Sequence, residues 1–278
     1  MKQEEKQEKR DHSSLLLILV FFVGLSVLLY PSISDHVNDL HQTQAIVDYE
    51  SHRQGMSDEE YEALFAAAQD YNRQIAQIPY PFMYFDKVEG YEEALDVNGT
   101  GVMGYIAIQK IGVMLPIYHG VSPGVLNVAV GHIPGSSLPT GGPGNHTVLS
   151  AHRGIPSAKL FSDLDDLQEG DTFTLTVLNR ELTYTVDQIL IVEPEQVDDL
   201  YVQEGKDYCT LVTCTPYGVN SHRLLVRGTR TETPQQEQQA IVSADAKQVS
   251  TLLVASLLAA AMLSVLFLIF LLKPRKRK

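Results

Sequence analysis

Cysteine is scarce in this chain of 278 residues, which carries only Cys209 and Cys214. The two lie on one predicted strand at an odd spacing, so their side chains point to opposite faces. A strand rises by about 3.3 Å per residue, which also leaves them too far apart to be bridged. The sequence therefore excludes a disulfide framework and predicts two free thiols. We expect Cys209 to be a small buried hydrophobe.

Basic residues are also few in the central part of the chain. Residues 31–248 contain 30 Asp and Glu but only 12 Lys and Arg, which gives a formal charge of −18. Nucleic-acid binding requires a basic face for the phosphates, so we exclude this class of function. No cluster of His, Asp and Glu in the sequence compels a metal site, and we expect neither a metal nor an organic cofactor.

Long apolar runs are present at both ends of the chain. A membrane-spanning helix needs roughly 20 apolar residues, and residues 249–272 meet that requirement. Residues 13–30 are a borderline case that fits either an anchor or a signal peptide. No small-x-small cleavage site follows them in residues 31–34 (PSIS), which favours an uncleaved anchor.

The charges that flank these runs predict the orientation of the chain. Four basic residues precede the first run and five follow the second, so the positive-inside rule places both termini in the cytoplasm. The unpaired Cys214 then lies in an oxidising compartment, where a free thiol suggests chemistry. The predicted organisation is a cytoplasmic N-terminus (1–12), an anchor or signal segment (13–30), an extracellular helical region (31–77), a lid loop (78–94), a β-barrel (95–230), a linker (231–248), a transmembrane helix (249–272) and a basic cytoplasmic tail (273–278).

A capping box predicts a helix ahead of the β-rich part. Ser57 fits the N-cap position and Glu60 the position three residues later. The apolar stripe that follows has helical spacing and should pack on the next domain; it consists of Tyr61, Leu64, Phe65, Ala68 and Ile75. Residues 31–52 are also expected to be helical.

Prolines and aromatic residues dominate residues 78–85 (IPYPFMYF). Proline removes a backbone donor and stiffens the chain, so this segment cannot be a central strand. Two interpretations remain open at this point. The segment is either a linker pinned to the core or a plug that lies over a site.

Short strand-like runs separated by turn signals follow from residue 101 onward. About eight such runs indicate a closed antiparallel barrel or a sandwich. The runs are residues 104–108, 111–118, 125–131, 147–151, 173–178, 182–191, 210–213 and 224–226. One helical turn is expected within residues 158–167.

A thiol and a guanidinium flank one predicted loop. Cys214 ends one strand and Arg223 begins the next, with turn residues between them. A thiol needs a base to become a good nucleophile. Among nine histidines, His152 and His222 are the leading candidates because each lies at a strand end, where rigid backbone meets an open rim. A lone histidine more often has a structural role, so the residues alone leave this choice open.

Several segments carry a family resemblance. Residues 210–214 (TLVTC), followed by Arg223, resemble the sortase signature TLxTC…R. Further segments resemble class C sortases, which polymerise pilins: residues 101–105 (GVMGY), 115–120 (LPIYHG), 135–139 (GSSLP), 150–154 (SAHRG) and 215–228 (TPYGVNSHRLLVRG). The resemblance covers most of residues 55–230.

The resemblance implies a fold and a reaction. The expected fold is an eight-stranded barrel with a helical N-terminal extension and two flanking transmembrane helices, on the outer face of a Gram-positive cell. Cys214 would be the nucleophile, His152 the general acid and base, and Arg223 the cationic stabiliser. The family cleaves an LPxTG-like sorting signal between Thr and Gly through a thioacyl intermediate. A lysine amine of another pilin then forms an isopeptide bond.

The resemblance also implies a lid. Class C sortases usually carry an Asp-Pro-aromatic motif whose acid pairs with the catalytic Arg and whose ring packs on the Cys. The matching residues are Tyr80, Pro81 and Phe82, so the acid is replaced here, and the spacing of Asp86 is wrong for a substitute. We therefore expect a lid held by aromatic packing. The alternatives are a housekeeping-type sortase that attaches proteins to the cell wall and a non-catalytic β-barrel binding module.

Overall fold

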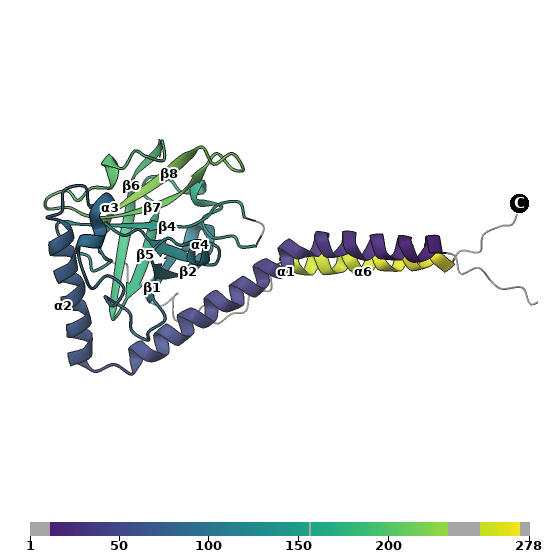
Figure 1. Cartoon of the computed structure of the whole chain (residues 1–278), viewed down its shortest axis with the longest axis horizontal. Coiled ribbons are helices and arrows are strands. Elements are labelled where there is room, and N and C mark those ends of the chain that lie inside the picture. The colour runs from purple at the N-terminus through teal and green to yellow at the C-terminus, as the bar shows by residue number, and fades with distance from the viewer. Residues whose placement is uncertain (1–11, 156, 233–250, 273–278) are drawn as a thin grey trace, which may run out of the picture. The chain divides into compact units, whose positions relative to one another are not determined.

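A computed structural model describes residues 12–155, 157–232 and 251–272 (Figure 1). The chain divides into two compact units. One combines Met1–His36 with Lys247–Lys278, and the other is Val37–Ala246. The predicted terminal segments and the linker lie almost wholly outside the described residues. The helices are α1 (His12–Gln54), α2 (Asp58–Ile75), α3 (Pro81–Tyr84), α4 (Pro123–Leu126) and α6 (Thr251–Leu272), with short 3-10 turns η1 (Phe85–Lys87), η2 (Gln109–Ile111), η3 (Leu164–Asp166) and η4 (Asp198–Leu200).

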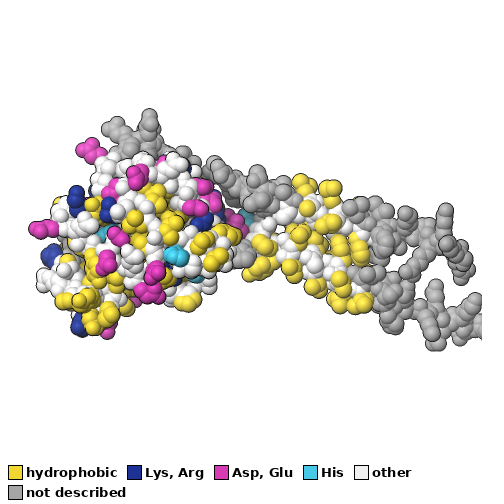
Figure 2. Space-filling view, turned by 90° about the horizontal axis from the view of Figure 1, so that it is seen from above, with side chains coloured by type: hydrophobic (Ala, Val, Ile, Leu, Met, Phe, Trp, Pro, Cys, Tyr) yellow, Lys and Arg dark blue, Asp and Glu magenta, His cyan; other side chains and the backbone are white. Residues whose placement is uncertain are grey.

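The first unit pairs two apolar helices. Within it, the rings of Phe21 on α1 and Phe267 on α6 stack with centroids 4.2 Å apart, and Ala260 is buried. Hydrophobic side chains dominate the described part of these helices in Figure 2. Among the described residues, Ile18–Gln54 is the one helix long and apolar enough to cross a membrane, and Ser256–Val265 is a shorter apolar stretch. Two transmembrane helices are therefore not established.

The second unit contains a closed eight-stranded β-barrel, as the sequence predicts. The strands are β1 (Val102–Ile108), β2 (Val113–His119), β3 (Val130–His132), β4 (Asn145–Ser150), β5 (Thr172–Val177), β6 (Arg180–Val192), β7 (Asp207–Thr215) and β8 (His222–Thr231). Their order around the barrel is β1-β2-β3-β4-β7-β8-β6-β5. The expectation of a purely antiparallel barrel is wrong, because β2 pairs with β3 and β4 with β7 in parallel. Long connections between these strands allow the parallel pairs.

The segment 125–131 is not the single strand that its apolar content predicts. A short helix, α4, occupies its first part, and β3 begins only at Val130. The reason is local: Ser122 caps α4 by accepting a hydrogen bond from the Val125 amide (3.4 Å), and Pro123 occupies the first turn. The helical turn expected within residues 158–167 is present as η3.

Alternation along β7 separates the two cysteines. Cys209 and Leu211 face the barrel core, whereas Val212 belongs to a second apolar cluster on the outer face of the sheet. Cys209 is fully buried, Cys214 is half-buried, and both thiols are free. The prediction of two unpaired thiols on opposite faces is therefore confirmed.

Helix α2 packs against the barrel through the predicted stripe. Its capping box is present: the Ser57 hydroxyl accepts from the Glu60 amide (3.3 Å), and the Glu60 carboxylate accepts from the Ser57 amide (2.9 Å). Arg180, at the start of β6, donates to the Tyr61 hydroxyl (2.9 Å), and its guanidinium lies 3.7 Å from the centre of the Phe65 ring. These contacts fix α2 on the β5–β6 hairpin and set where the next segment, residues 78–94, begins.

Candidate active site

The β7–β8 hairpin places the thiol and the guanidinium face to face. Cys214 and Arg223 are direct partners in the antiparallel pairing of the two strands. Side chains at such a pair point the same way, with their Cβ atoms about 5 Å apart. The Arg223 guanidinium donates to the backbone carbonyls of His222 (3.1 Å) and Asn220 (3.3 Å). The hairpin thus presents a half-buried thiol beside a permanent positive charge.

His152 reaches the same rim from β4. The parallel pairing of β4 with β7 ends with Ser150 opposite Val212, so the residues two positions further along are His152 and Cys214. The chain stays in this alignment beyond the strands, because the Ala151 amide donates to the Val212 carbonyl (3.2 Å). Thr213 Oγ1 in turn donates to the Ala151 carbonyl (2.9 Å). The structure therefore brings His152, Cys214 and Arg223 to one end of the barrel.

His222, the other candidate from the sequence, faces away from this group. It pairs with Thr215, one position beyond the Cys214–Arg223 pair, so strand alternation turns it to the opposite face. Its side chain is exposed, and its Nδ1 lies 2.8 Å from the Ser221 hydroxyl. The geometry favours His152 as the base.

An apolar cluster covers the outer face of the sheet next to the thiol; we call it the outer cluster. It consists of Val148, Val192, Leu200, Val212 and Leu225, with Phe82, Ile133, Leu190 and Val197 packed against it. Val212 and Leu225 form the strand pair that follows Cys214 and Arg223 along this face. The outer cluster therefore leads directly to the reactive pair.

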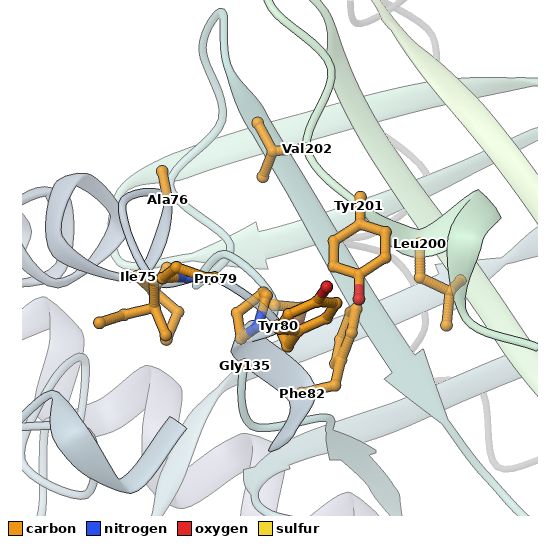
Figure 3. Close-up of a pocket in the computed structure, with 12 residues that line it drawn as sticks. Ile75, Ala76, Pro79, Tyr80, Phe82, Gly135, Leu200, Tyr201 and Val202 are labelled. Atoms are coloured by element: carbon orange, nitrogen blue, oxygen red, sulfur yellow. The ribbon is translucent and has the colours of Figure 1, made fainter. Parts of the chain in front are cut away.

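The segment around Phe82 lies on the outer cluster. The ring of Phe82 packs against the ring of Tyr201 (Figure 3), and the two ring centroids are 5.6 Å apart. The end of α2, this segment and the β6–β7 loop line a cavity of about 270 Å³. Residues 78–85 contain a short helix, α3, rather than only a loop, and Phe82 within them packs against the outer cluster. This placement fits the plug interpretation.

Gly135 forms the seat of this segment. A Cβ atom at Gly135 would lie 2.6 Å from the Pro81 carbonyl oxygen and 2.9 Å from Phe82 Cα. Tyr80 precedes the short helix with a left-handed backbone (φ 58°) and is 67% exposed. Within the described ranges, Arg223 forms no ion pair, and its hydrogen bonds go to backbone carbonyls. Close packing rather than an ionic latch therefore holds the segment in place.

Two buried histidines, to which the sequence assigns no role, anchor the loops around the site. His146 Nδ1 donates to the Tyr201 carbonyl (3.0 Å) and its Nε2 accepts from the Thr210 hydroxyl (2.7 Å), which fixes the β6–β7 loop. His132 lies 2.9 Å from the Tyr91 hydroxyl through Nδ1 and bonds the Ser137 carbonyl through Nε2. Burial lowers the pKa of each histidine to about 4. The sequence does not reveal the structural role of either histidine, because the burial of both depends on loops that are distant in the sequence.

These histidines predict a loss of stability in acid. Their pKa rises from about 4 in the folded chain to about 6.5 in the unfolded chain, so unfolding takes up protons between these values. The free energy of unfolding should therefore fall as pH drops from 6.5 to 4, by up to roughly 3 kcal/mol for each histidine. Urea denaturation of the full chain in detergent at several pH values measures this slope. His146→Gln should flatten the slope, whereas His222→Gln, at an exposed position, should leave it unchanged. An unaltered slope in His146→Gln would contradict the assignment.

Comparison with known proteins identifies the family. The model of the sortase domain matches residues 106–231. A crystal structure of sortase C1 from Streptococcus agalactiae is 46% identical, with a TM-score of 0.63, and the match covers 69% of this chain and 100% of that one. The chain belongs to the sortase family. Sortases are cysteine transpeptidases, so the chain is an enzyme of this class.

Two further relatives complete the comparison. Sortase C of Clostridium perfringens, in a crystal structure with the C-terminal cell wall sorting motif, is 40% identical (TM-score 0.60, 69% of this chain and 100% of that one). A sortase A of Streptococcus agalactiae is 35% identical over 117 residues, which is 41% of this chain and 47% of that protein. The matched part thus spans about half the length of that curated relative. Among the described residues of this sortase, no group of three metal-ligating side chains occurs.

Proposed function

We propose that this sortase joins pilin subunits through lysine isopeptide bonds after cleaving an LPxTG-like sorting signal between Thr and Gly. The observation that carries the proposal is the convergence of the Cys214–Arg223 strand pair with His152, two residues beyond the β4–β7 pairing. The similarity to sortase C of Streptococcus pneumoniae, whose structure is described as giving insight into pilin substrate specificity, supports pilins as substrates. The sorting motif in the Clostridium perfringens structure supports a sorting signal as the acyl donor.

The proposed reaction has two acyl transfers. The Cys214 thiolate attacks the Thr carbonyl carbon of the sorting signal and forms a C–S bond, and the oxyanion accepts hydrogen bonds from Arg223. His152 donates its proton to the Gly amine, which leaves as the C–N bond breaks. A neutral lysine amine of a second pilin then attacks the thioester. His152 takes the amine proton, the C–S bond breaks, and Cys214 returns to its starting state.

The lid of this reaction would be the segment with Tyr80, Pro81 and Phe82. Phe82 occupies the outer cluster, along which an extended sorting signal would reach Cys214. Substrate binding would therefore require this segment to lift from Gly135. With no acid at position 80, we expect the lid to open without breaking an ion pair.

We also propose that the enzyme is anchored on the outer face of the membrane, with both termini in the cytoplasm. Support comes from the unbroken helix α1, which continues through Pro31, and from the stacking of Phe21 on Phe267 of α6. A cleaved signal peptide would remove Phe21. The intact mass of the mature protein tests this, since loss of the N-terminal segment would contradict the anchor.

Linkage mapping tests the proposed function. The enzyme in detergent is mixed with two candidate pilins, one carrying the sorting signal and one carrying the acceptor lysine. We expect covalent ladders, with mass spectrometry locating an isopeptide bond between the Thr carbonyl and a lysine. An acceptor pilin with that lysine changed to Arg should form none. Transfer only to a cell-wall peptide amine would instead favour the alternative of a housekeeping-type sortase.

A further inference from the structure

Arg153 directly follows the proposed base and is buried to a degree unusual for arginine. Its side chain is only 9% exposed, although its ion-pair partner Asp165 is 48% exposed. Nη2 donates to the Asp165 carboxylate. Nε is buried and has no hydrogen-bond partner in the described part of the chain. The position of this guanidinium therefore depends on one ion pair and on whatever packs against its face.

The face of the guanidinium meets an aromatic ring from the opposite loop. Tyr217, in the loop between β7 and β8, lies with its ring centre 5.7 Å from the Arg153 guanidinium carbon. The same ring covers Gly154, where a Cβ atom would be 2.8 Å from a ring carbon. Tyr217 is 63% exposed, so hydrophobic burial alone does not explain this placement. The cation–π interaction between Arg153 and the Tyr217 ring explains it, and such an interaction contributes about 0.5–1 kcal/mol at a partly exposed site.

The loop that carries Arg153 is itself fixed to its surroundings. The His152 carbonyl accepts a hydrogen bond from the Phe161 amide (3.1 Å), and the Gly154 amide donates to Ser162 Oγ (3.1 Å). The loop that carries Tyr217 begins just after Cys214 and ends just before Arg223. The contact between Arg153 and Tyr217 therefore joins two loops that lie beyond the last paired residues of their strands, where the hydrogen bonds of the sheet no longer connect them.

We propose that Arg153 and Tyr217 form a clamp in which both are positioning residues: the clamp holds the loop of His152 against the loop between Cys214 and Arg223 during acyl transfer. The inference rests on the proposed function for its kinetic consequence, but the clamp itself is a contact between two loops. Displacing a general acid by about 1 Å can cost up to about 100-fold in rate. A weak, partly exposed contact should cost less, so we expect about a tenfold loss of kcat with KM nearly unchanged.

Kinetics of peptide cleavage by the full chain in detergent test the clamp. Tyr217→Ala should lower kcat for an LPxTG peptide about tenfold, and Tyr217→Phe, which keeps the ring, should restore it. Arg153→Lys keeps the charge for Asp165 but loses the planar face, so it should resemble Tyr217→Ala. The double variant should be no slower than either single one, because both remove one contact. Val219→Ala, at a 70% exposed position in the same loop, is the matched control and should behave as wild type.

Hydrogen exchange provides a readout that does not depend on the substrate. In Tyr217→Ala, the amides of Gly154 and Phe161 should exchange faster, while those of β4 and β7 and the thermal unfolding temperature stay unchanged. Unaltered exchange, a change in KM alone, or multiplicative losses in the double variant would overturn the clamp. If wild type cleaves no sorting peptide while exchange in the variant rises, the proposed function fails and the clamp stands.

Discussion

Cys214→Ala is expected to abolish both cleavage of the sorting signal and formation of the thioacyl intermediate. Without the sulfur there is no atom to form the covalent bond, and the loss of a nucleophile costs at least about 10⁴-fold in rate. Incubation with an LPxTG peptide, followed by intact-mass analysis, measures both steps at once. Wild type should gain the mass of the acyl fragment and the variant should not.

Cys209→Ala is the matched control for this experiment. Cys209 lies on the same strand but is fully buried in the barrel core. Its replacement removes a small hydrophobe far from the outer face, so cleavage should remain within about twofold of wild type while stability falls slightly. Cleavage by Cys214→Ala, or its loss in Cys209→Ala alone, would contradict the assignment of the nucleophile.

Arg223→Lys should reduce kcat by about 100-fold, because a point charge cannot replace the planar fork that donates to an oxyanion. Arg227→Lys is the comparison, since Arg227 lies four residues further along the same face of β8. Arg227 is engaged by Asp187 (2.9 Å from Nε) and by the Tyr208 ring (4.3 Å), away from the thiol. Its replacement should leave the chemical step within severalfold of wild type. Equal losses in the two variants would indicate a general effect of charge rather than a role of Arg223 at the reaction centre.

The sequence could place Cys214 and Arg223 together because one short loop joins their strands. Choosing the base was harder, since His152 meets Cys214 only through the parallel pairing of β4 with β7, and Ala151 and Thr213 are 62 residues apart. Neither composition nor spacing reveals that register. The register of β8 turns His222 to the other face, and this separates two histidines that the sequence ranked together.

Features that depend on tertiary contacts were beyond the sequence. The capping residues of α4 outweighed an apolar run that read as a strand. The histidines His132 and His146 looked unremarkable because their burial comes from loops distant in sequence. The prolines and aromatic residues of residues 78–85 excluded a central strand, but they left open whether the segment is a linker or a plug. Its close contact with Gly135 could not be predicted, because a close approach of two backbones leaves no mark in a glycine-rich loop.

Gly135→Ala is expected to open the lid by displacing the segment that packs on this glycine. The new Cβ would lie 2.6 Å from the Pro81 carbonyl oxygen, closer than non-bonded atoms allow, so the lid segment or the loop beneath it must move. The lid segment is the more easily displaced, because α3 has no buried residue and Tyr80 is exposed. We therefore expect faster modification of the Cys214 thiol by a bulky thiol reagent.

Phe82→Ala should act in the same direction by a different cause. A buried Phe replaced by Ala costs about 3–5 kcal/mol, and for the half-buried Phe82 we expect about 1.5 kcal/mol. Because this energy favours the closed lid, its loss should raise the rate of Cys214 modification about tenfold. Hydrolysis of the sorting peptide should rise with it. Unchanged modification and hydrolysis would show that the segment does not control access.

Gly170→Ala separates lid displacement from backbone strain in the glycine experiment. Gly170 has nearly the same backbone angle as Gly135 (φ 96° and 94°), but nothing lies within 4 Å of a Cβ atom there. Both variants carry similar strain and should lose similar stability in thermal unfolding. Only Gly135→Ala should accelerate modification of Cys214. Equal acceleration in both variants would attribute the effect to general loosening of the fold and contradict the seating of the lid on Gly135.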